Sequence, residues 1–181
     1  MRRYPSADDI TEMWARGYDR STIDEAVGLS ERREWLDRVK AKIHGAFKDV
    51  QLGSGVGLRE AQSLDNYAGD AERAACRASD RTTDWQLISS EELNECNSSL
   101  SFFDAEGMRF HLPAYLIADL DGEYRFGMAF CLTRHSREGF SLLNKAQAAA
   151  VRDYLLFIEE EPDYERDRED IRRALEESWV E

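Results

Sequence analysis

The chain has 181 residues, of which 42% are hydrophobic and 34% charged, and its formal net charge is −13 at pH 7. Such a charge repels a phosphate backbone, which argues against nucleic acid as a partner. No segment approaches the roughly 18 apolar residues of a membrane span. Three cysteines without paired spacing argue against a disulfide framework or a zinc site. We therefore expect one globular domain over residues 1–181, located in the cytoplasm, with no metal and no cofactor.

Helix-capping signals divide the N-terminal part of the chain. Ser6 and Asp9 form a capping box that begins a first helix, which ends near Gly17. A short second helix follows and ends at Gly28, and Ser30 caps a longer third helix. The sequence thus predicts three helices before the glycine-rich segment.

Residues 51–57 contain three glycines and predict a loop. Small apolar residues then recur at helical spacing from Leu58 to Ala78, and Gly69 divides this stretch into two helices. A glycine-rich loop before a helix can present backbone N–H groups to an anion, with Arg59 in the first turn. The loop lacks the Gly-Lys-Ser/Thr ending of a phosphate-binding loop, so we interpret it as a structural turn.

Ser89 with Glu92 forms a further capping box for a short helix near residues 91–96, and Asn144 with Gln147 forms one for a helix that continues through Ile158. The C-terminal residues 163–179 are predicted to form an acidic amphipathic helix. About seven helices are expected in total.

The central segment carries mixed signals. Apolar residues alternate over residues 100–112 and again over residues 124–132, which is the pattern of half-buried strands. Pro113 suits the first turn of a buried helix that ends at Leu120. We therefore predict an α+β fold that is predominantly α-helical, with a minor antiparallel β element. In this arrangement His111 lies at the edge of the core or in solvent, with a pKa near the usual value of about 6.5.

The same segment carries a distinctive motif, an aromatic-x-Leu-Pro-Ala-aromatic sequence. Its residues are Phe110, His111, Leu112, Pro113, Ala114 and Tyr115. With its flanking stretches, from Phe47 to Ile158, it resembles a family of uncharacterised bacterial soluble proteins. The resemblance implies a shared fold and a bacterial origin, and it implies no reaction.

Two groups of residues contain possible metal ligands, but neither has the spacing that a metal site requires. Cys131 and His135 are four residues apart, but a predicted strand end does not bring them into tetrahedral geometry. Asp119, Asp121 and Glu123 surround a glycine, yet the remaining ligand positions of a calcium loop are absent, so a helix-ending turn is the better interpretation.

Two hypotheses for function follow. The first is a non-catalytic acidic module that binds or regulates a basic protein, in the manner of an immunity protein. Residues 159–181 hold eleven acidic residues and four arginines, and the partner-binding candidates are Glu159, Glu160, Glu161 and Trp179. The alternative is an enzyme or small-ligand binder with a pocket near Pro113. Its polar candidates are Arg109, His111 and Tyr115.

Overall fold

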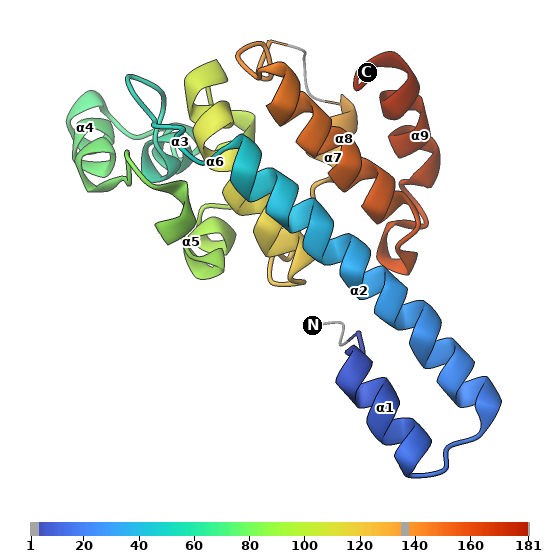
Figure 1. The fold of residues 1–181 in the computed structure, drawn as a ribbon. Helices are drawn as coiled ribbons and strands as arrows, with labels where there is room; N and C mark the ends of the chain where they lie inside the picture. The colour runs from blue at the N-terminus through green and yellow to red at the C-terminus, as the bar shows by residue number, and fades with distance from the viewer. Residues whose placement is uncertain (1–3, 135–137, 181) are drawn as a thin grey trace.

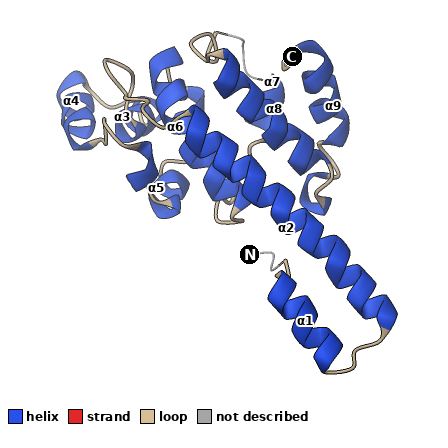
Figure 2. Ribbon diagram, viewed as in Figure 1, coloured by secondary structure: helices blue, strands red, loops and turns tan. Residues whose placement is uncertain are grey.

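The computed structural model describes residues 4–134 and 138–180. Over these ranges the chain is 67% helical and contains no strand (Figure 2). The fold is therefore all-α, and the predicted α+β class with an antiparallel β element is wrong. Within the described ranges, no helix combines the length and the apolar character that crossing a membrane requires.

The helices follow one another with short connections. The α-helices are α1 (Ala7–Ala15), α2 (Arg20–Ala46), α3 (Leu58–Asp65), α4 (Asp70–Ser79), α5 (Ser90–Glu95), α6 (Ala105–Leu120), α7 (Ala129–Arg134), α8 (Lys145–Glu159) and α9 (Arg168–Glu177). Short 3₁₀ turns occur at η1 (Trp85–Leu87), η2 (Ser99–Ser101) and η3 (Pro162–Tyr164).

Local capping signals were predicted well. The capping boxes that begin with Ser6, Ser89 and Asn144 are all formed, at the starts of α1, α5 and α8. Gly69 separates α3 from α4 and is the N-cap of α4. The prediction of two separate helices around Gly28 and Ser30 is wrong, since α2 runs through both positions. One glycine in a helix costs only about 1 kcal/mol relative to alanine, which the other residues of a 27-residue helix offset.

The predicted strand over residues 100–112 is helical from Ala105 onward. The side chain of Asp104 accepts a hydrogen bond from the Gly107 N–H at 2.7 Å, which caps the first turn of α6. Ten of the sixteen residues of α6 are buried. A helix that is buried on several sides carries apolar residues on several faces, so alternating apolar residues appear in it without any strand. Pro113 lies inside this helix and not at its start.

The predicted strand over residues 124–132 is also wrong, because a turn leads there into α7. Tyr124, Met128 and Leu132 are buried, whereas Phe126 and Phe130 are 59% and 66% exposed. Ala129 and Cys131 are buried as well, so the buried positions from 128 to 132 include pairs three and four residues apart, which is the helical spacing and not the alternation of a strand.

The long helix α2 crosses the front of the molecule, with α8 beside it (Figure 1). The shorter helices α3, α4 and α5 gather at one end, and α9 lies at the opposite end. The buried core is formed mainly by the inner faces of α2, α6 and α8. It includes Val39, Ile43, Phe110, Leu112, Leu116, Val151, Tyr154 and Leu155.

One part of the molecule extends from this body. Helix α1 and the N-terminal half of α2 form a helical hairpin that projects beyond the other helices (Figure 1). We call residues 4–34 the arm. Ile23 and Ala26 of α2 are buried, whereas α1 contains no buried residue. The arm therefore exposes far more of its surface than the body does.

Candidate functional site

His111 is the second residue of the α6 motif, and its side chain is buried within the helical body. Only 1% of its surface is exposed, and its ring stacks on Phe103 with centroids 4.4 Å apart. The Nδ1–H donates to the Gly107 carbonyl at 2.7 Å, so Nε2 carries the lone pair. Nε2 is buried and has no hydrogen-bond partner among residues 4–134 and 138–180. Burial lowers the pKa of His111 to about 4, so the predicted position at the edge of the core is wrong.

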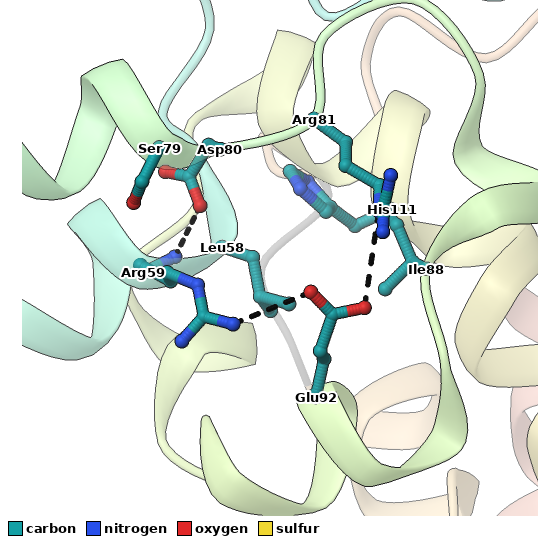
Figure 3. Close-up of a pocket in the computed structure, with 8 residues that line it drawn as sticks. All are labelled: Leu58, Arg59, Ser79, Asp80, Arg81, Ile88, Glu92 and His111. Atoms are coloured by element: carbon teal, nitrogen blue, oxygen red, sulfur yellow. Dashed lines mark hydrogen bonds and ion pairs between the residues drawn. The ribbon is translucent and has the colours of Figure 1, made fainter.

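A small cavity lies beside this imidazole, where α3, the end of α4, α5 and α6 meet (Figure 3). Its lining residues are Leu58, Arg59, Ser79, Asp80, Arg81, Ile88, Glu92 and His111. The cavity measures about 10 Å³, which is the volume needed for one water molecule. It is too small for an organic substrate.

Asp80, on the wall of this cavity, directly follows α4 in the sequence but caps the start of α3. Its carboxylate accepts hydrogen bonds from the backbone N–H groups of Arg59 at 2.8 Å and Glu60 at 3.2 Å, in the first turn of α3. A Cβ on Gly57 would lie 1.9 Å from Asp80 Oδ2, so only glycine permits this approach. Burial raises the pKa of Asp80, although these hydrogen bonds oppose the shift. The first turn of α3 therefore already holds an anion, the side chain of Asp80.

Glu92 closes the other side of the cavity and links two arginines. It lies 3.3 Å from Arg59 and 3.8 Å from Arg81 (Figure 3). Burial alone would raise the pKa of Glu92, but hydrogen bonds from Ser89 and the charge of Arg81 lower it overall. Glu92 is thus paired with the two arginines, whereas Asp80 is held by the backbone N–H groups of α3.

The three ligand-binding candidates do not converge. Residues 109 and 111 are separated by about 200° around a helix, so Arg109 and His111 point to different sides of α6. Tyr115 follows His111 by one turn, is fully buried, and packs edge-on against Tyr124 with centroids 5.1 Å apart. Its hydroxyl has no hydrogen-bond partner in the described parts of the chain, and burial raises its pKa well above the usual value. Arg109 instead lines a separate hollow near the start of α8.

Sequence reasoning missed a buried carboxylate. Asp119 accepts hydrogen bonds from the hydroxyls of Tyr154 at 2.5 Å and Tyr164 at 2.6 Å. Burial raises the pKa of Asp119, and the two hydroxyls oppose that shift. A cavity of about 150 Å³ adjoins this group, between the end of α6 and η3. The available signal was the position of Asp119 directly after the apolar run 112–118, although its neighbours Asp121 and Glu123 favoured the interpretation as a turn.

The acidic candidates at the end of α8 take part in intramolecular ion pairs. Glu161 is buried and lies 2.8 Å from Arg32, and the exposed Glu160 lies 2.5 Å from the same guanidinium. Glu159 pairs with Arg172 of α9 at 2.6 Å. These contacts join α2, α8 and α9, and partner binding by the three glutamates stays a prediction.

Trp179, the fourth partner-binding candidate, lies against the body of the protein. It is 7% exposed, its indole N–H donates to the Leu132 carbonyl at 3.1 Å, and its ring meets Phe140. A partner would reach it only after this contact opened.

Cys131 and His135 are the possible metal ligands that lie four residues apart in the sequence. Cys131 is buried in α7, and burial raises the pKa of its thiol to about 12. His135 lies outside the described residues. Over residues 4–134 and 138–180, no three His, Cys, Asp or Glu side chains are grouped so as to hold a metal ion.

Comparison with known proteins gives one match. The profile of a family of unknown function (DUF6714) matches residues 35–181. No curated protein and no solved structure matches the chain. The match begins within α2 and leaves out α1 and the first half of α2.

Proposed function

We propose that this chain, which belongs to the family of unknown function through residues 35–181, is a non-catalytic protein-binding module that docks on its partner through the arm. The supporting observation is the exposure of large apolar side chains there. Trp14 is 58% exposed, Tyr18 48%, Val27 40% and Leu29 41%. Aromatic residues of this kind dominate the binding energy of protein interfaces.

The weak packing of α1 supports the same proposal. It has nine residues, none of them buried, and its main packing partner is α2. An isolated helix shorter than about 12 residues is marginal in water, because few hydrogen bonds offset the cost of nucleation. A partner that covers the arm would bury Trp14 and Tyr18 and stabilise α1.

The charge of the arm indicates the charge expected on the binding surface of its partner. Residues 4–34 contain eight acidic residues and four arginines, and all eight acidic residues are exposed. Each of those arginines already pairs with a carboxylate of this chain, which leaves an excess of negative charge. The partner we propose is therefore a protein with an apolar patch bordered by lysine and arginine side chains.

The test begins with the full chain in cells that produce it. Trp14 is replaced by a photo-crosslinking phenylalanine analogue, and the cross-linked protein is identified and purified. Its affinity is then measured for the wild type and for the Trp14→Ala, Tyr18→Ala and Leu87→Ala variants. Leu87 is the matched control, because it is 59% exposed and lies outside the arm.

Docking through the arm predicts that Trp14→Ala and Tyr18→Ala weaken binding by about tenfold or more, that Leu87→Ala leaves it unchanged, and that salt weakens it. Equal affinity of Trp14→Ala and the wild type would refute the proposal. So would light scattering that shows a stable dimer, with a second copy of this chain as the only cross-linked species.

A further inference from the structure

A second surface feature, independent of the arm, lies where the end of α2, the middle of α6 and the start of α8 meet. It is a hollow of about 310 Å³, within the size range of small-molecule sites. Its lining residues are Gly45, Ala46, Lys48, Asp49, Val50, Arg109, Asn144 and Gln147.

Two basic side chains in this hollow have no ionic partner. Lys48 and Arg109 form no ion pair within the described part of the chain, although this chain carries a net charge of −13. The Nε of Arg109 is buried and has no hydrogen-bond acceptor among the residues that the structure describes. A buried donor without an acceptor costs free energy, about 1–3 kcal/mol in typical proteins, so an acceptor from outside would be stabilising. Asp49 is the single carboxylate among the lining residues.

The start of α8 adds to the positive potential. Asn144 and Gln147 cap each other, since the side chain of each accepts from the backbone N–H of the other, at 3.0 and 2.9 Å. The Gln147 amide also donates to the Ala46 carbonyl at 3.3 Å, which fixes α8 against α2. Because Asn144 and Gln147 line the hollow, the N-terminal end of a 15-residue helix, with its positive dipole end, lies beside it.

We propose that this hollow binds a small phosphate-bearing anion. The guanidinium of Arg109 offers a planar fork of donors that suits phosphate oxygens, and Lys48 supplies a second positive charge. Carboxylate groups carry less charge, so phosphate is preferred over them at a site with two cations. The proposal stands apart from partner docking, because the arm begins at the other end of α2.

Isothermal titration calorimetry with inorganic phosphate, at constant ionic strength, tests this site in the full-length protein. Four proteins are compared: the wild type, Arg109→Gln, Lys48→Gln and Arg166→Gln. Arg166 is the matched control, because it is exposed, forms no ion pair in the described chain, and changes the net charge by the same amount. Lys48 is exposed, so Lys48→Gln is expected to fold even if Arg109→Gln does not. Acetate serves as the carboxylate probe.

The expected result is that Arg109→Gln weakens phosphate binding about tenfold and Lys48→Gln severalfold, while Arg166→Gln binds like the wild type. Amide resonances of Lys145 and Ala146 are expected to shift on addition of phosphate to the wild type. Absence of binding by the wild type at about 10 mM phosphate, which would mean a Kd well above the millimolar range, would overturn the proposal. An equal loss in Arg109→Gln and Arg166→Gln, or tighter binding of acetate, would overturn it as well.

Discussion

Acid should destabilise this protein through His111. The folded protein holds this imidazole neutral with a pKa of about 4, whereas an unfolded chain has the usual value of 6.5. The folded state therefore binds fewer protons than the unfolded state between these two values. The stabilisation of the folded state that comes from neutral His111 is fully present above pH 6.5 and is lost as the pH falls towards 4. Over this whole range the loss is about 3 kcal/mol, since one pKa unit corresponds to about 1.4 kcal/mol.

Between pH 7.5 and pH 5 the expected loss from His111 alone is about 2 kcal/mol. Urea unfolding followed by tryptophan fluorescence at several pH values measures it. The variant His111→Phe keeps a ring against Phe103 and removes the titrating group. Its unfolding free energy should change by about 2 kcal/mol less than that of the wild type over the same range. Asp80 and Asp119, whose pKa values are raised by burial, remain in both proteins and cancel in the comparison.

The control is His44→Gln, which leaves His111 in place and should keep the acid loss. His44 is partly exposed and lies at the end of α2, stacked on Trp85. Identical pH dependence in the wild type and His111→Phe would refute the reasoning, because it would show that burial does not hold the imidazole neutral.

Three further substitutions probe separate features. Gly57→Ala should destabilise the fold by about 2 kcal/mol or more, because the new methyl group would collide with Asp80 and displace the cap of α3; an unchanged urea midpoint would contradict this. Tyr164→Phe removes a hydroxyl that donates to buried Asp119 and should cost about 1–3 kcal/mol in thermal unfolding, so a loss below about 0.5 kcal/mol would argue against that hydrogen bond. Gly28→Ala should slow amide hydrogen exchange in the first half of α2 about fivefold, since nothing lies within 4 Å of the added carbon; unchanged exchange rates would count against a continuous helix there.

Sequence reasoning succeeded where the signal was local. A capping box joins residues three positions apart, so Ser6, Ser89 and Asn144 were identified without knowledge of the tertiary structure. It failed where a helix is buried on several sides. In α6 the alternation of Met108, Phe110 and Leu112 is a consequence of general burial, and it was interpreted as a strand.

The error in secondary structure carried over into the site. A strand would have placed His111 opposite its apolar neighbours, at the edge of the core. In the helix it lies one turn from Tyr115, on the side that faces the body, while Arg109 points elsewhere. The contact of Asp80 with α3 spans about 20 residues of sequence and depends on Gly57 lacking a side chain, so no local sequence pattern predicts it.

The continuity of α2 determines what docking on the arm can do. The family match begins at residue 35, inside this helix, and the helix continues through that boundary without a break. A helix of 27 residues is about 40 Å long and much stiffer than a flexible linker. The ion pairs of Arg32 with Glu160 and Glu161 fix it to the end of α8 just where the arm leaves the body. A partner bound to Trp14 would therefore be held at a defined orientation to the family domain, which a flexible tether would not provide.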